Sequence, residues 1–93
     1  MRSIVIAPGA TPAGTDIPLP GRLERLVSAQ VYDPTSGPTA LTVVETTPAS
    51  GEIYLSTPGT VQLGTALTAA QQVILVGVGV GEAVARTVRY IGA

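Results

Sequence analysis

The sequence Gln72-Val-Ile-Leu-Val-Gly-Val-Gly-Val-Gly81 decides the fold class. Residues 73–76 are four consecutive apolar residues, three of them β-branched, and such a short run predicts a buried strand rather than a helix. The run is too short to span a membrane, which takes about 20 apolar residues. Glycines at every second position then leave one face of the strand without side chains. We therefore expect Gly77 and Gly79 to contact another backbone or a neighbouring subunit, or to mark a bend or bulge at a sheet corner.

The composition around this strand is typical of short strands joined by turns. The chain has 93 residues, enough for one small domain, and 45% of them are hydrophobic. Only 12% are charged, which is about half the usual share. Five basic and six acidic residues give a net charge of −1 without a long basic run, so we expect no binding to nucleic acid. The low charge density favours packing against copies of the chain or against a partner over a monomeric sandwich.

The N-terminal part combines a short strand with a segment rich in proline and glycine. Arg2–Ala7 predicts the strand, and too few apolar residues follow Arg2 for a signal peptide. Residues 8–21 contain four prolines and three glycines, which exclude a helix. We interpret them as an extended arm that contacts a neighbouring subunit, with a loop crossing the domain's own end as the alternative. The predicted partner contacts are Pro8, Pro12, Ile17, Pro18, Leu19 and Pro20 of the arm, with Gly77 and Gly79 of the glycine-rich strand.

Residues 22–32 predict a long, half-buried strand with alternating faces. The side chains expected to face the core are Leu23, Val27, Ala29 and Val31. Arg25 and Leu26 break the alternation, and the break indicates a strand edge, a bulge or a brief helical turn.

Further short strands are predicted over residues 39–45, 52–56, 61–63 and 83–91. Thr57-Pro-Gly-Thr60 is a type II turn signal, so we expect residues 52–63 to form a hairpin. Residues 64–71 predict a loop with one helical turn, in which Thr68 and Gln71 have capping-box spacing. Residues 83–91 also fit a helical stripe, but they are too few for a stable helix, and Gly81-Glu82 favours a hairpin with the glycine-rich strand.

Strands of this length and spacing predict an all-β fold, namely a small antiparallel β-sandwich or jelly-roll-like barrel with an extended N-terminal arm. Residues 1–93 would form one domain, with strand and arm over 1–21 and the sandwich core over 22–93. We expect this core to fold without residues 1–20.

The side chains that most enzymes depend on are scarce. The chain has no His and no Cys, which excludes an imidazole base, a thiolate nucleophile and a disulfide. The acidic residues are scattered singly, so we expect no catalytic residue, no cofactor and no metal, and an enzyme using carboxylates alone is the weakest hypothesis. Residues 77–82 lack the Lys-Ser/Thr and the helix of a phosphate-binding loop. Tyr32, Tyr54 and Tyr90 leave open an adhesive β-sandwich that binds glycans.

Two stretches resemble small β-rich structural proteins of tailed bacteriophages. Residues 51–76 read Gly-Glu-Ile-Tyr-Leu-Ser-Thr-Pro-Gly-Thr-Val-Gln-Leu-Gly, followed by Leu-Thr-Ala-Ala-Gln-Gln-Val after two residues, which is a hairpin with a closing strand. Ile4-Val-Ile-Ala-Pro-Gly-Ala10 and Ile17-Pro-Leu-Pro-Gly-Arg22 are similar to the start of such proteins. The resemblance touches about half of the chain and contains no catalytic signature.

This resemblance implies a non-enzymatic virion subunit, first of all a capsid decoration (cement) protein that stabilises a phage head lattice. A head–tail connector or a tail accessory subunit is the alternative. The implied partners are the major capsid protein or other virion subunits, together with further copies of the chain, and neither nucleic acid nor a membrane. The implied location is the virion, assembled in the host cytoplasm.

Overall fold

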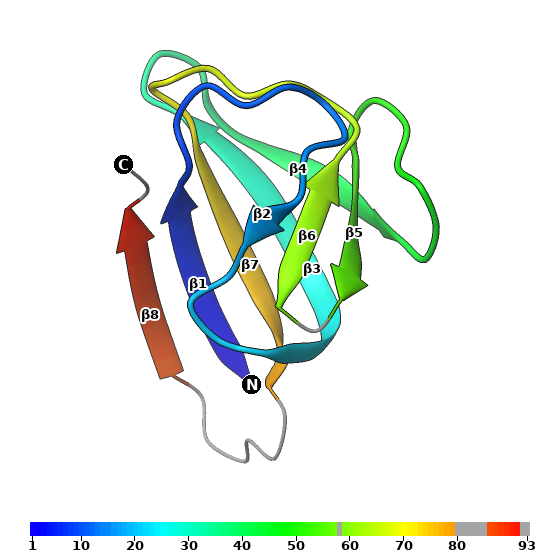
Figure 1. The fold of residues 1–93 in the computed structure, drawn as a ribbon. Coiled ribbons are helices and arrows are strands. Elements are labelled where there is room, and N and C mark those ends of the chain that lie inside the picture. The colour runs from blue at the N-terminus through cyan, green and yellow to red at the C-terminus, as the bar shows by residue number, and fades with distance from the viewer. Residues whose placement is uncertain (58, 80–85, 92–93) are drawn as a thin grey trace.

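The computed structural model describes residues 1–57, 59–79 and 86–91, and in these ranges the chain is all-β and has no helix. No segment of the described chain is therefore a helix that could cross a membrane. The strands are β1 (Arg2–Ala7), β2 (Ile17–Pro18), β3 (Leu23–Asp33), β4 (Gly37–Val44), β5 (Glu52–Thr57), β6 (Thr60–Leu63), β7 (Gln72–Gly79) and β8 (Arg86–Ile91). They form one sheet in the order β2-β6-β5-β4-β3-β7-β1-β8, which curls into a half-barrel (Figure 1).

The sheet is mixed, so the prediction of a purely antiparallel arrangement is wrong. β1 runs parallel to β8, and β4 runs parallel to β5. The first parallel pair arises because β1 occupies the edge of β7, which places β8 beyond β1 instead of in a hairpin with β7. The strand predicted over residues 83–91 is confirmed for Arg86–Ile91. The turn predicted at Gly81-Glu82 and the end of the glycine-rich strand at Val80 lie outside the described residues.

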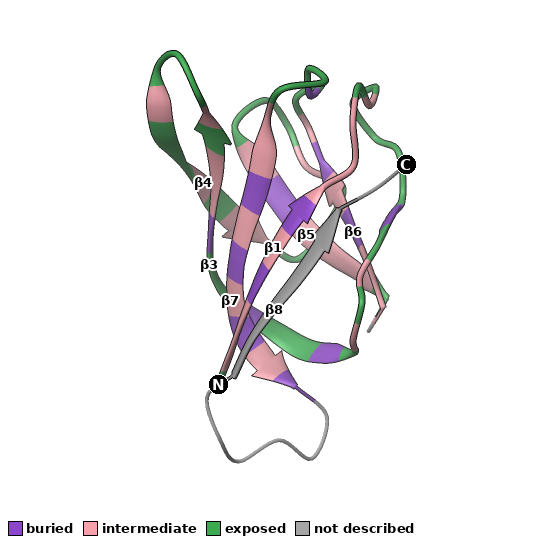
Figure 2. Ribbon diagram, turned by 90° about the vertical axis from the view of Figure 1, so that its left-hand side faces the viewer, coloured by how far each residue is buried: buried purple, intermediate pink, exposed green. Residues whose placement is uncertain are grey.

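The core fills the inside of the curl and contains buried residues from both residues 1–21 and residues 22–93 (Figure 2). The side chains that are most completely buried are Ile4, Ile6, Leu23, Ile53, Val61, Val73 and Leu75. Ile4 and Ile6 belong to β1, which lies between β7 and β8, and Ile17 of β2 is only 3% exposed. Residues 1–21 therefore contribute to the core, contrary to the expectation of a core built from residues 22–93 alone.

Two irregularities in β3 explain its broken alternation. The register with β7 shifts between Leu23 and Arg25 and again between Leu26 and Ser28. Each shift inserts a residue and reverses the face to which the following side chains point, so the bulge was the correct alternative. Leu23 and Leu26 are consequently both buried, at a spacing of three. Val27, which we expected to face the core, is instead 46% exposed.

The hairpin of β5 and β6 is confirmed, with Ile53 opposite Leu63. The type of its turn depends on Pro58, so the type II geometry stays a prediction. Hydroxyl groups close the turn: the Thr60 Oγ1 atom lies 2.7 Å from Thr57 Oγ1 and 2.8 Å from Ser56 Oγ. Pro58 lies outside the described residues.

The segment before β7 forms a turn rather than the predicted helical turn. The Thr68 backbone N–H donates to Gln71 Oε1 at 2.9 Å, and the Gln71 N–H donates to the Thr68 carbonyl oxygen at 3.2 Å. The side-chain contact that the capping-box spacing predicted is therefore present without a helix.

Candidate protein interaction site

Residues 8–21 lie across their own domain (Figure 1). Thr11 and Leu67 exchange two backbone hydrogen bonds of 3.0 and 2.8 Å, and the Leu19 N–H donates to the Gly59 carbonyl oxygen at 2.8 Å. These bonds produce the alternative arrangement, in which the segment is a loop crossing the end of its own domain. A contact between this segment and a neighbouring subunit stays a prediction.

The predicted contact residues of this segment divide by burial. Ile17 is a core residue, because the pairing of β2 with β6 sets it opposite Val61, and it is not available to a partner. Leu19 is half-buried and packs against the core. Pro8 is half-buried, and Pro12, Pro18 and Pro20 are exposed. Of the predicted contact residues in this segment, Pro12, Pro18 and Pro20 therefore present the most surface to a neighbour.

Gly77 and Gly79 are buried against the chain's own strand β3. A Cβ atom at Gly77 would lie 2.6 Å from the Arg25 carbonyl oxygen and 3.1 Å from Leu23 Cδ1. The close backbone approach that the alternating glycines predicted is thus present at Gly77, and the bulged part of β3 supplies the backbone. Because β3 already covers these two glycines, they do not form a contact surface for a neighbouring subunit.

The opposite face of the same strands carries aliphatic side chains. Val5 of β1 and Ile74 of β7 are register partners. Both are half-buried, and so are Val76 and Val78 of β7. Val27 stands beside them on β3 and is exposed. We call these five residues the outer stripe. It presents a β-branched surface on the convex side of the curl, and the exposed Arg25 is the register partner of Val78 at one end of it.

A groove opens where β4 leaves β3. β4 pairs with β3 only as far as Leu41, opposite Ala29, and from Thr42 onward it pairs with β5. Residues 23–28 of β3 pair with β7 along one edge, and none of the described strands pairs with their other edge. The opening, which we call the β3–β4 groove, has a volume of about 450 Å³. It is lined by Glu24, Arg25, Leu26, Val43, Val44, Glu45 and Leu55.

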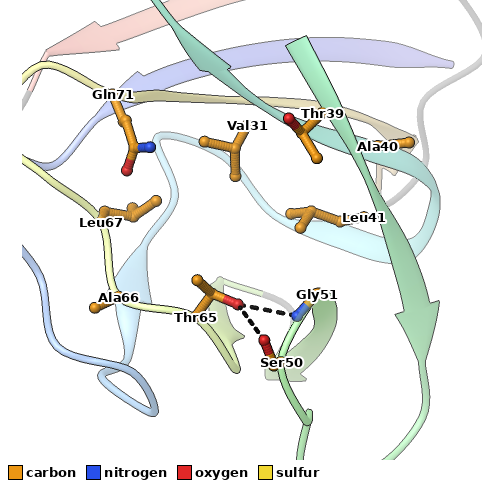
Figure 3. A pocket seen from close by; sticks show the side chains of 10 residues that line it. All are labelled: Val31, Thr39, Ala40, Leu41, Ser50, Gly51, Thr65, Ala66, Leu67 and Gln71. Atoms are coloured by element: carbon orange, nitrogen blue, oxygen red, sulfur yellow. Dashed lines mark hydrogen bonds between the residues drawn. The ribbon is translucent and has the colours of Figure 1, made fainter. Parts of the chain in front are cut away.

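A second hollow, of about 210 Å³, lies at the other end of β3 (Figure 3). Val31, Leu41 and Leu67 supply its apolar wall. Thr65 Oγ1 accepts a hydrogen bond of 2.9 Å from the Gly51 N–H and lies 3.4 Å from Ser50 Oγ. None of the residues lining this hollow is ionisable near neutral pH, so it offers no acid or base for catalysis.

Asp33 is an acidic residue with a clear structural task. Its Oδ1 atom accepts hydrogen bonds from the backbone N–H groups of Thr35 and Ser36 at 2.8 and 3.3 Å, and Gln71 Nε2 donates to Oδ2 at 3.3 Å. The bond from Thr35 is the main reason that the pKa of Asp33 lies below its usual value, while desolvation acts in the opposite direction. Asp33 therefore holds the turn between β3 and β4.

Acidic side chains elsewhere in the described ranges do not gather into a metal site of three or more His, Cys, Asp or Glu residues. Asp16, for example, contacts uncharged groups, accepting a hydrogen bond from Gln62 Nε2 at 2.6 Å and one from Ser56 Oγ at 3.5 Å. The two surface features that remain as candidate sites are the outer stripe and the β3–β4 groove. The alternation of Ile74, Val76 and Val78 is a sequence signal for part of the stripe, which we did not predict from it, whereas the groove has no sequence signal.

Comparison with protein-family models, curated proteins and solved structures found no match to this chain.

Proposed function

We propose that the chain is a non-enzymatic structural subunit of a tailed-phage virion, and that it works as a capsid decoration protein bound in many copies to the head lattice. The outer stripe carries this proposal. Contiguous apolar surface on a small protein marks a place where another protein binds. Here Val27 is 46% exposed at the edge of the half-buried residues Val5, Ile74 and Val76, on a chain with few charges.

Binding in many copies to a repeating lattice compensates for the small area of the outer stripe. Each subunit would bury only a small apolar area, which by itself gives weak binding. Linked or neighbouring copies that bind at once raise the total affinity by orders of magnitude without any new contact. The resemblance of residues 51–76 to β-rich phage structural proteins supports the same class of protein. The exposed prolines of residues 8–21 would add contacts beside the stripe.

Immunogold electron microscopy on particles from the source culture, with an antibody against this chain, tests the proposal. Label distributed over the heads is the expected result. Label at one vertex or along a tail would instead assign the chain to the connector or the tail. Intact particles without label, in a lysate that contains the free protein, would rule out a virion subunit.

The glycan-binding alternative rests on Tyr32, which is 39% exposed near the end of β3. An exposed aromatic ring is a common platform for a sugar face. Titration with glycans, followed by NMR, separates the two functions. Saturable shifts centred on Tyr32 would favour the adhesive module.

A further inference from the structure

We propose that the β3–β4 groove binds an extended segment of a partner chain that carries a large aliphatic side chain next to a Lys or Arg. This inference deepens the proposed function, since it specifies the chemistry of the surface to which the subunit attaches. It depends on the groove's backbone edges, its aliphatic lining and the charged residues beside that lining.

The backbone edges select a strand as the occupant. The Thr42 N–H donates to the Gly51 carbonyl oxygen at 3.0 Å, on the β5 side. Successive backbone groups of a strand point to opposite edges, so the N–H and C=O of Val43 point into the groove. Across the groove, residues 23–28 of β3 present an edge that no described strand covers. An extended segment placed between these edges would extend the sheet by backbone hydrogen bonds, a known mode of peptide recognition.

The floor selects an aliphatic side chain. Four aliphatic residues, Leu26, Val43, Val44 and Leu55, line the groove, and Leu26 is almost fully buried. Val43 and Leu55 also pack against the core, so the floor is a rigid continuation of it. An aliphatic side chain of the partner would gain the transfer free energy that accompanies burial of such groups.

The rim selects a basic neighbour for that side chain. Glu24 and Glu45 are exposed on the groove lining, where Arg25 is the one basic residue. The rim therefore carries a net charge of −1, from two carboxylates and one guanidinium. A Lys or Arg of the partner is attracted to such a rim, and an acidic residue is repelled. The β1 strand of a second copy is a poor occupant for a separate reason, because β1 is already paired along both edges with β7 and β8.

NMR titration of the full chain with short synthetic peptides tests the inference. The probe is acetyl-Thr-Val-Arg-Val-Thr-amide, and the comparison peptide replaces the central Arg with Glu. We expect saturable amide shifts at Leu26, Val43 and Leu55 with the Arg peptide, and binding of the Glu peptide that is weaker by about tenfold. Absence of shifts up to millimolar concentration, or equal binding of both peptides, would overturn the inference. Shifts confined to the outer stripe or to the hollow of Figure 3 would also overturn it.

Two variants with the same change in net charge supply the control. The Glu24→Gln, Glu45→Gln double variant removes both rim carboxylates, whereas Ala69→Lys, Ala70→Lys adds two charges at an exposed turn at the other end of the sheet. We expect the first to weaken binding of the Arg peptide by about fivefold and the second by less than twofold. Equal effects would show that only the overall charge matters, and would contradict a groove site.

The outcomes separate this inference from the proposed function. If the particles are labelled but the groove binds no peptide, the proposed virion role is retained and the groove is rejected as a binding site. Peptide binding in the groove, together with unlabelled particles, would reject the virion role alone. Analytical ultracentrifugation tests whether a second copy of the chain occupies the groove. Self-association that the Arg peptide reverses would assign the groove to a second copy and would reject a separate partner.

Discussion

Gly77 and Gly59 show how one residue type serves two different purposes in this chain. At Gly77 the backbone of β3 lies so close that no side chain fits. At Gly59 nothing lies within 4 Å of the position that a Cβ atom would take. The first glycine is required by packing against the bulged strand, whereas the second occupies a turn with room to spare.

The Gly77→Ala variant should therefore lower the free energy of unfolding by about 1 to 3 kcal/mol, because the added methyl group collides with the Arg25 carbonyl oxygen in a place where neither backbone moves easily. Gly59→Ala is the matched control, and its effect should stay within about 0.5 kcal/mol. Urea unfolding of both variants provides the measurement. Equal stability of the two variants would contradict the close packing of β7 on β3.

Asp33 gives the stability a specific dependence on pH. Its pKa in the folded chain lies below the ordinary value of an aspartate, so its contribution to stability is fully present above that ordinary value and is lost as the pH falls through the lowered folded pKa. The Asp33→Asn variant should consequently lose less stability than the wild type between about pH 4 and pH 2. Urea unfolding across this range compares the two. Parallel stability profiles would show that the carboxylate does not hold the turn.

Among the elements, β1 and β2 integrate the N-terminal part into the domain. β1 is paired on both edges, and β2 brings Ile17 into the core opposite Val61. Removal of these strands would expose β7 along one edge and would open the core beside Leu75 and Val73. The stability of the remaining strands therefore depends on residues 1–20.

We predict that the chain without residues 1–20 does not fold cooperatively, since it loses the buried side chains of Ile4, Ile6 and Ile17. The single variant Ile17→Ala should by itself cost about 2 to 5 kcal/mol, and Pro18→Ala, at an exposed neighbouring position, less than about 0.5 kcal/mol. Circular dichroism during thermal unfolding measures all three. A sharp transition in the shortened chain would mean that residues 22–93 form a core of their own.

Most strands could be predicted from the sequence because their signals are local. Alternation and turn residues identified β1, β4, the β5–β6 hairpin and β7. The alternating glycines of β7 correctly indicated that another backbone lies close to Gly77. The position of β1 between β7 and β8 could not be predicted, since strand order depends on contacts between residues far apart in the chain. The bulges of β3 had a signal, at Arg25 and Leu26, but the number of inserted residues had none, and so Val27 was placed on the wrong face. The β3–β4 groove follows from that same strand order and had no local signal either.

At the scale of the whole molecule, the curl separates a packed interior from a convex face that is free to contact other proteins. The described interior has no buried polar or charged side chain, and it is stabilised by aliphatic packing alone. The convex face carries the outer stripe, and the β3–β4 groove opens where β4 diverges from β3. The half-barrel is thus a scaffold with two surfaces suited to protein contact.

The Val27→Asp variant should weaken particle binding by about tenfold while leaving the fold intact, because it places a charge where the partner would have to exclude water. Val27 is 46% exposed, so the substitution does not disturb the core. Ala69→Asp, at an exposed turn position away from the stripe, is the control with the same change in charge. Co-sedimentation with purified particles measures binding, and equal retention of both variants would exclude the outer stripe from the interface.

The most direct test of the central claim is a cryo-electron microscopy reconstruction of particles from the source culture. We predict density for this half-barrel at repeated positions on the head, with Val27, Ile74 and Val76 covered by a neighbouring subunit. A well-resolved particle without that density, or with the outer stripe facing solvent in every copy, would contradict it.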